Sequence, residues 1–324
     1  MYVLLNSLKN ESIIGMKLKA QTAAITKAQH AFLDSVVAIQ ADRATPEDIA
    51  FIARQFVQAT LPHRDPKANT WSRKNGNYTL SLQTAFDDKG EPIGLPYGVI
   101  PRLLVFWLVT EAVRTKDPVL QLGHNLAAFM REIGLDPTHG GKKGDPQRLE
   151  VQMRRFFSAR IAFFEQLNAN GQTGETAEFM PIARSYTLWW DSKQPHQGTL
   201  WNSSVKLDSE FFKAIIAAPV PLDTRALKAL KRSPLALDLY MLCCYEAHRV
   251  QRTGKTRFIP WRALSKQIGS NYKAGNDAAV WEFARKSREA LTKIQAVMPS
   301  LSLDHTADGG FTILSSSHPA ISSK

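Results

Sequence analysis

Two stretches of this 324-residue chain repeat one order of predicted elements, and this repetition limits the fold more than any other feature. Each stretch has an apolar helix, a short β-like piece, a second helix, a glycine turn, a third helix that is basic, and a hairpin. The first copy places them at residues 100–113, at 119–122, from Asn125 or Leu126, at Gly134, at 146–159 and around 168–171. The second copy opens at 233–240, has its β-like piece at 257–260, turns at Gly269 and ends in a hairpin through Gly309 and Gly310. This order is typical of a winged helix, a fold that often binds nucleic acid.

The predicted fold class is α+β, mainly α, with two tandem winged-helix domains and a helical N-terminal extension. A length of 324 residues agrees with two domains, and 44% apolar residues can bury a core in each. We expect a partly flexible helical extension over residues 1–60. The first winged-helix domain, with extra strands, is expected over 61–218, and the second over 219–324.

Segments outside the repeats carry further predictions. Thr45, with Pro46 next and Asp48 three positions later, indicates a helix start and predicts a helix over 46–59. Residues 61–94 are polar and turn-rich with one strand near 78–85, so they form either a linker or an extra sheet. The prolines within 218–223 predict an extended joint between the copies, where we expect the hinge. A strand at 200–207 and helices at 209–216 and 224–231 flank this joint.

The charge balance favours a polyanionic partner. The formal net charge is +12, and the excess leans toward the second copy, where residues 233–324 carry 12 basic and 7 acidic side chains. Cys243 and Cys244 are adjacent within an apolar helix, which predicts buried thiols in a reducing compartment. No apolar run approaches the roughly 18 residues of a membrane span, so we expect no membrane contact and a place in the cytosol.

The third helix of the first copy predicts one DNA-contacting face. At about 100° per residue, Leu149, Met153, Phe156 and Phe157 share an apolar face. The predicted opposite face carries Arg148, Val151, Gln152, Arg154 and Arg155. In a major groove Arg reads guanine and Gln reads adenine, although such a face can also be merely solvated. Lys142 and Lys143, in the glycine-rich turn before this helix, are predicted to contact phosphates.

The third helix of the second copy predicts a second contacting face. Its buried stripe is expected to comprise Phe283, Ser287, Ala290, Leu291 and Ile294. The side chains predicted to contact DNA lie opposite: Trp281, Arg285, Arg288 and Thr292, with Lys286 on the same helix and Lys273 before it. A tryptophan beside two arginines on a polar face is not explained by solvation alone, so this face is the stronger prediction of the two.

Several strings resemble the RepA-type plasmid replication initiators. They are Leu95-Pro-Tyr-Gly98, Pro101-Arg-Leu-Leu104, Thr110-Glu-Ala-Val-Arg114, Leu188-Trp-Trp-Asp191, and Pro219-Val-Pro-Leu-Asp223 through Ser233-Pro-Leu-Ala-Leu-Asp-Leu-Tyr240. The resemblance covers residues 95–319. It implies a protein that binds repeated sites (iterons) in the double-stranded DNA of a plasmid origin, helps to open the duplex, and recruits a host replication initiator and helicase. The wider initiator group is built from tandem winged-helix domains, and its partners can include a second copy of the chain in a dimer.

The sequence lacks the residue patterns that several enzymatic functions would need. None of the 8 histidines forms the His-x-His pair that a rolling-circle nuclease needs for its metal. The Gly140-Gly-Lys-Lys-Gly144 turn lacks the spacing and the Ser or Thr of a nucleotide-binding loop, and no cysteine or histidine spacing suits zinc. Tyr240, Trp189 and Trp190 are expected in the core or at a domain joint. We therefore predict no catalytic residue, no metal and no cofactor.

The leading prediction is origin binding that initiates plasmid replication. Two alternatives from other classes stay open. A sequence-specific transcriptional repressor, acting also on its own promoter, would use the same domains on an operator. A winged-helix module for protein docking would leave the basic faces solvated.

Overall fold

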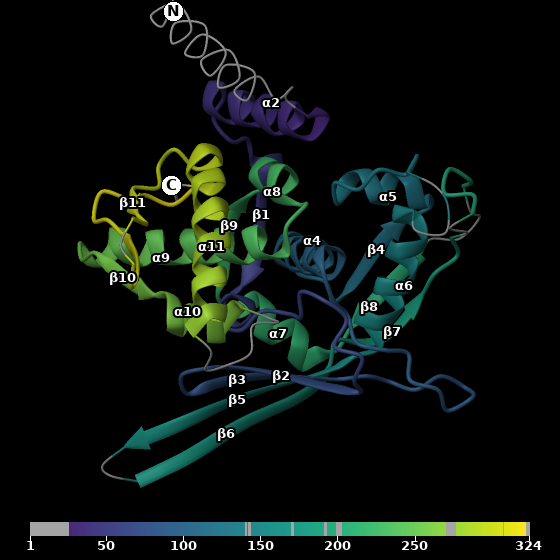
Figure 1. The fold of residues 1–324 in the computed structure, drawn as a ribbon. Helices are drawn as coiled ribbons and strands as arrows, with labels where there is room; N and C mark the ends of the chain where they lie inside the picture. Colours follow the sequence, from purple (N-terminus) through teal and green to yellow (C-terminus); the bar gives the residue numbers. More distant parts are fainter. Residues whose placement is uncertain are drawn as a thin grey trace, which may run out of the picture.

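The computed structural model describes residues 26–139, 141, 144–169, 172–190, 193–198, 203–269, 277–306 and 308–321. Helices and strands are mixed throughout (Figure 1), which confirms the predicted α+β class. The helices are α2 (Lys27–Ala41), the short 3-10 helix η1 (Pro46–Asp48), α3 (Arg54–Gln58), α4 (Val99–Thr115), α5 (Leu126–Glu132), α6 (Asp145–Ser158), α7 (Ser209–Ala217), α8 (Thr224–Leu230), α9 (Pro234–Thr253), α10 (Trp261–Ile268) and α11 (Asp277–Val297). The strands are β1 (Ile49–Ala53), β2 (Thr70–Asn75), β3 (Tyr78–Gln83), β4 (Val119–Gly123), β5 (Arg160–Ala169), β6 (Gln172–Pro181), β7 (Ala183–Thr187), β8 (Ser203–Leu207), β9 (Pro219–Asp223), β10 (Arg257–Pro260), β11 (Leu303–Asp304) and β12 (Gly310–Ile313).

The predicted element order is present twice, but the two copies pair their strands differently. In the second copy, β10, β12 and β11 form one small sheet. Gly310 allows β12 to approach β10 closely, because a Cβ at this position would lie 2.4 Å from the carbonyl oxygen of Ile259. In the first copy, β4 pairs with β8 instead, and the hairpin of β5 and β6 joins another sheet. The strands of the first copy therefore do not form one small sheet together. They pair with strands outside the copy, β4 with β8 and β5 with β3.

Residues 61–94 form an extra sheet and are not a linker. β2 and β3 pair antiparallel, and β3 continues the sheet to β5 in the order β2-β3-β5-β6. The inner face of this sheet buries Leu80, Leu82 and Phe163 beneath the helices. Arg73 on β2 is also buried and donates to the carbonyl oxygens of Lys266 (3.2 Å) and Gly269 (2.9 Å) at the end of α10. The sheet added to the first copy thus caps a helix of the second.

The helix predicted over 46–59 is wrong in its middle, at β1, although η1 and α3 at its two ends are helical. The helix-start signal does form, since Thr45 and Asp48 cap the 3-10 helix η1, but the chain then enters β1. Its residues pair antiparallel with β9, from Ile49 opposite Asp223 to Ala53 opposite Pro219. On its other side, the Phe51 N–H donates to the Thr110 hydroxyl of α4 at 2.8 Å. Partners distant in sequence therefore outweigh the local helix signal here. The joint predicted as extended is confirmed as β9.

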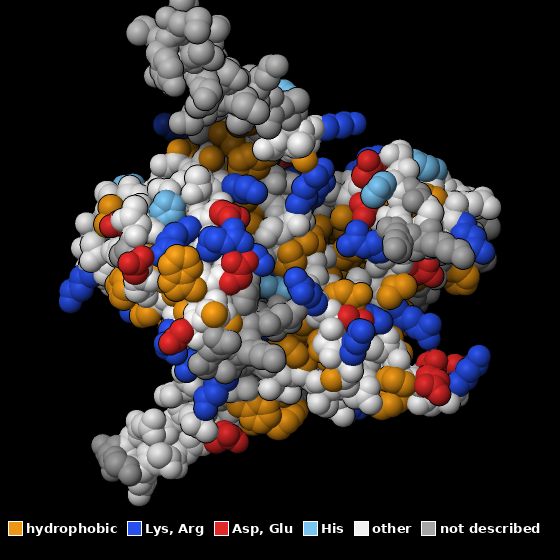
Figure 2. Space-filling model, in the orientation of Figure 1, with side chains coloured by type: hydrophobic (Ala, Val, Ile, Leu, Met, Phe, Trp, Pro, Cys, Tyr) orange, Lys and Arg blue, Asp and Glu red, His pale blue; other side chains and the backbone are white. Residues whose placement is uncertain are grey.

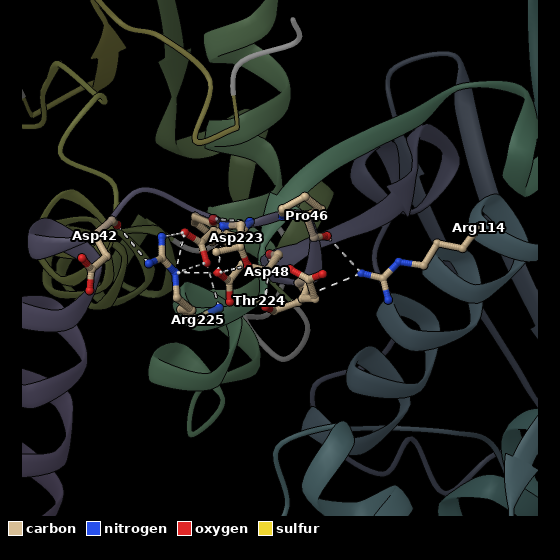
Figure 3. Close-up of polar contacts among 10 residues, drawn as sticks. Asp42, Pro46, Asp48, Arg114, Asp223, Thr224 and Arg225 are labelled. Carbon is tan, nitrogen blue, oxygen red and sulfur yellow. Dashed lines mark hydrogen bonds and ion pairs between the residues drawn. The ribbon is translucent and has the colours of Figure 1, made fainter.

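Polar contacts hold β1 and η1 between the two copies (Figure 3). On one side, an Arg114 Nη of α4 donates to the carbonyl oxygen of Ile49 at 2.8 Å. On the other side, Arg225 of α8 pairs with Asp223 at 2.7 Å and donates to the Asp42 carbonyl oxygen at 3.0 Å. The Thr224 hydroxyl donates to the Asp48 carbonyl oxygen at 3.1 Å. The segment before the first copy is thus attached to both copies.

A buried ion pair joins the opening helices of the two copies. Arg102 of α4 donates from Nε and Nη2 to the two carboxylate oxygens of Asp238 on α9, both at 2.7 Å. Its remaining N–H groups donate to the carbonyl oxygens of Leu61, Pro62 and Gly98. His63 Nε2 lies 2.7 Å from Asp238 Oδ2. Burial alone would raise the pKa of Asp238, but the Arg102 charge and the hydrogen bonds from His63 and Arg102 lower it below its usual value.

One continuous apolar core runs through the described residues. Cys243 and Cys244 lie free and buried within it, as predicted. Tyr240 is fully buried, and its hydroxyl accepts from the Asp223 N–H at 3.1 Å, which places it at the joint as expected. Trp190 packs against Phe129, with ring centroids 5.3 Å apart, whereas Trp189 is 49% exposed. Within the described chain, none of the helices is both long and apolar enough to cross a bilayer.

Candidate nucleic-acid interface

The buried side of α11 fixes which of its faces is open. Phe283, Ser287, Leu291 and Ile294 are fully buried and Ala290 is nearly so, which confirms the predicted stripe. This stripe packs α11 against α9 and α10. Because the helix is anchored by one face, its opposite face is presented rigidly to solvent.

The open face of α11 combines a large aromatic side chain with cations. Trp281 is 70% exposed, and the Arg285 and Lys286 side chains are 50% and 43% exposed. Lys and Arg side chains gather over α11 on the face shown in Figure 2, beside hydrophobic side chains. An exposed tryptophan among cations suits a nucleic acid, because the indole contacts sugars or bases while the cations neutralise phosphates. Trp281 and Arg285 therefore lie on the open side of α11, as their spacing predicted, and Lys286 is exposed next to Arg285 on the same helix.

Two glutamates on the same helix orient Arg285. Its guanidinium donates to Glu282 at 2.7 and 2.8 Å and also pairs with Glu289 one turn further on. Lys286 lies 3.1 Å from the same Glu282. Hydrogen bonds from Arg285 and Lys286 lower the pKa of Glu282 to about 2. Exposed pairs of this kind are weak, so a DNA phosphate or base edge can replace a glutamate at small cost.

The other two predicted residues of this face attach α11 to its own hairpin. The Arg288 Nε donates to the His305 carbonyl oxygen at 3.1 Å, and its guanidinium lies over the Trp261 ring at 5.3 Å. The Thr292 hydroxyl lies 3.2 Å from His305 Nε2. Burial lowers the pKa of His305, which favours the neutral ring that these contacts surround. DNA contact by Arg288 and Thr292 stays a prediction, but both have a structural role without it.

The predicted face of α6 is only partly open. Arg148 and Arg154 are exposed, and Val151 between them is 50% exposed. Gln152 was expected on this face and this is wrong, because it is 6% exposed and its Oε1 accepts from the Tyr97 N–H at 3.0 Å. Its spacing explains the burial, since it stands one helical turn from both Leu149 and Phe156.

Arg155 also lies away from the open face, contrary to the prediction. Its guanidinium pairs with Asp65 at 3.2 Å, donates to the Leu95 carbonyl oxygen at 3.3 Å and stacks on the Tyr97 ring at 5.4 Å. These contacts hold the segment before α4 against α6. Three further residues of the predicted interface, Lys142, Lys143 and Lys273, lie outside the described residues.

Neither hairpin carries positive charge beyond Arg160 at the start of β5. The sequence contains no Lys or Arg over residues 161–183, which include most of β5 and β6, or over residues 294–323, which include β11 and β12. Any phosphate contacts must therefore come from other parts of the chain, such as the exposed basic side chains of α6 and α11.

The structure also assigns residues that the site prediction missed. Arg102, Thr110, Arg114, Asp223 and Asp238 all join one copy to the other or to β1. All five residues fall within the strings quoted above. For Arg102 and Asp238 a signal was available, since a charge inside an apolar helix needs a buried partner.

Comparison with known proteins identifies the source of these strings. The family model described as "Plasmid encoded RepA protein" matches residues 95–262, just over half of the chain. The chain belongs to this RepA family. The RepA match includes all five of these joining residues and the whole of α6, and it ends at Arg262, before α11.

Two solved structures share a broad likeness with this RepA family member. One is entitled "Crystal structure of SeMet derivatives of domain2 and domain 3 of RctB", with 12% identity and a TM-score of 0.46 over 81% of this chain and 95% of that one. The other, "Crystal structure of the RctB domains 2-3, RctB-155-483", has 13% identity and a TM-score of 0.45 over 80% and 95%. A search of curated proteins finds no match.

Proposed function

We propose that the chain is a plasmid replication initiator that binds repeated sites in origin DNA through two winged-helix units. The observation that carries this proposal is the open face of α11, where Trp281 and Arg285 stand one turn apart on a rigidly anchored helix, with Lys286 exposed next to Arg285. Membership of the RepA family supports the plasmid origin as the target. In each unit the third helix, α6 or α11, enters a major groove.

The charged residues divide into two roles in this proposal. Arg285 is held by Glu282 and Glu289 in a defined orientation, so it reads a base edge. Arg148 and Arg154 contact phosphates from α6, joined by Lys142, Lys143 and Lys273, which precede the two helices in the sequence. The chain acts by binding alone and carries no catalytic group in this mechanism.

The joined copies set the geometry of the site. The Arg102–Asp238 pair and the β1–β9 sheet link the units. One monomer should therefore protect roughly two helical turns of an asymmetric site, with contacts about 10 bp apart. Footprinting of the purified protein on its plasmid origin tests this arrangement. Inserting base pairs between the two contacted grooves should weaken binding, whereas the same insertion outside the protected site should not.

Origin opening and recruitment of a host initiator and helicase complete the proposed function, with a dimer as a second form of the protein. Permanganate reactivity of the A·T-rich DNA beside the sites distinguishes an initiator, which melts that DNA, from a repressor, which leaves it paired. Retention of DNA under heparin challenge distinguishes both from a docking module. A palindromic site bound strictly as a dimer, or a footprint of a single turn, would rule out the two-groove arrangement.

A further inference from the structure

The hairpin of β5 and β6 reaches beyond the body of the molecule (Figure 1) and differs chemically from the helices. β3 pairs with β5 only from Arg160 to Glu165, so among the described residues the hairpin has no third strand beyond that point. Its described residues from Glu165 to Phe179 are all exposed. In a chain of net charge +12, residues 161–183 contain three glutamates and no Lys or Arg. This part of the surface repels phosphates and attracts cations.

The outer edge of β6 is open to another strand. β5 and β6 pair in unbroken register from Arg160 opposite Pro181 to Ala169 opposite Gln172, and β6 pairs with no other described strand. Proteins usually protect such edges with lysine, proline or a bulge. Between Gln172 and Met180 the strand has none of these. It therefore presents a long regular edge that can accept an added strand.

An aromatic pair with one exposed member lies on the outer face of the same hairpin. Phe164 and Phe179 meet edge to face with their centroids 5.4 Å apart, and Phe179 is 73% exposed. Glu175 shares this face, because it stands four residues from Phe179 along the strand, whereas Glu178 points to the opposite face. An apolar anchor beside an open edge, with a carboxylate on each face, suits a partner strand that carries both apolar and basic side chains.

We propose that the β5–β6 hairpin is a docking arm for an extended, lysine- or arginine-bearing segment of another protein, which pairs with the edge of β6 and packs on Phe179. Charge complementarity selects this occupant. The phosphates of a nucleic acid would be repelled by the carboxylates of Glu165, Glu175 and Glu178. A second β6 placed edge to edge would bring its own glutamates against these, and like charges across strands are destabilising. The proposal is independent of DNA binding by α11.

The experiment uses the full chain and, as probe, a labelled extended peptide of valines and threonines with lysines on both faces. Anisotropy at low salt should show binding that weakens about tenfold or more, equivalent to about 1.4 kcal/mol, in Glu175→Lys with Glu178→Lys and in Phe179→Ser. Asp88→Lys with Glu91→Lys makes the same charge change in an exposed turn and should bind the peptide as the wild type does. A peptide N-methylated along both edges, which leaves neither edge with N–H donors, tests the strand pairing and should not bind.

Each contrary outcome overturns the docking arm in a recognisable way. Equal binding of the N-methylated peptide would exclude strand addition, and unchanged binding by the Glu175→Lys, Glu178→Lys variant would exclude charge selection. If Phe179→Ser converts a dimer to a monomer, the occupant is a second copy. If reversal of Glu175 and Glu178 raises affinity for origin DNA more than the control reversal does, the hairpin lies on DNA. Peptide binding without any origin binding would contradict the proposed function and leave the docking arm intact.

Discussion

Arg102 and Asp238 face each other across the boundary between the two repeats, each from the opening helix of its own copy. Both side chains are nearly inaccessible to water, at 3% and 1% exposure. A shift of one repeat against the other that kept this interface closed would leave both charges buried without their partner, which is costly. The pair therefore ties the orientation of one repeat to that of the other.

Removing one member of this pair should destabilise the fold strongly. Arg102→Met leaves the Asp238 carboxylate buried without its main partner, and we expect a loss of about 3–5 kcal/mol in chemical denaturation. Arg102→Met with Asp238→Leu should recover part of that loss, because no buried charge remains. Arg148→Met, at an exposed pair with Asp145, should change stability by less than about 0.5 kcal/mol. A double variant as unstable as the single one would show that the charge itself is not the cause.

His63 should make stability fall with acidification. Burial lowers the pKa of His63 below its usual 6.5, despite its hydrogen bond to Asp238. A lowered pKa means that the unfolded state takes up a proton more readily, so stability is lost as pH falls below about 6.5 and on through the folded-state pKa. The lowered pKa of Asp238 acts in the same direction at lower pH. We expect urea midpoints to fall between about pH 7.5 and pH 5, and to fall less in His63→Asn. The same slope in both proteins would assign the effect to other groups.

Arg285 should confer sequence preference. Arg285→Ala is expected to cost about 1–3 kcal/mol on the cognate site, and to relax preference at one base pair. Glu282→Gln keeps the cation while it weakens the orienting contact, so it should relax preference with a smaller loss of affinity. Binding titrations on the origin site and on single-base variants check both. Equal losses on cognate and random DNA would mean that Arg285 only contacts phosphate.

Arg154 and Arg155 provide neighbouring variants with opposite expected effects. Arg154 is exposed on α6, so Arg154→Ala should weaken cognate and random DNA alike and lower the salt slope by about 1. Arg155 is engaged with Asp65, Leu95 and Tyr97, so Arg155→Met should lower the unfolding midpoint and leave the salt slope unchanged. A reversed pattern would mean that the open face of α6 has been assigned wrongly.

The features that could be predicted from the sequence are those that depend on a local pattern of residues. The apolar spacing of Phe283, Leu291 and Ile294 fixed both faces of α11, and helix-breaking prolines indicated the extended β9. The prediction that Gln152 lies on the open face was wrong because it followed the polar residue type. Its spacing in sequence from Leu149 and Phe156 puts it on the buried side. The strand β1 was predicted as helix for another reason. The segment around Phe51 follows a valid helix start, and its strand partners lie far along the chain.

That distance has a consequence for how the protein is made. β1 leaves the ribosome before any of the first repeat, but its partner β9 emerges only after that repeat is complete. Until then the edge of β1 has no strand to pair with, and Arg102 has no Asp238. The nascent first repeat therefore cannot complete its packing until residues of the joint and of α9 have been synthesised. Non-local pairing of this kind slows folding. A chain released early, before Asp238 is synthesised, would expose both the open strand and the unpaired arginine.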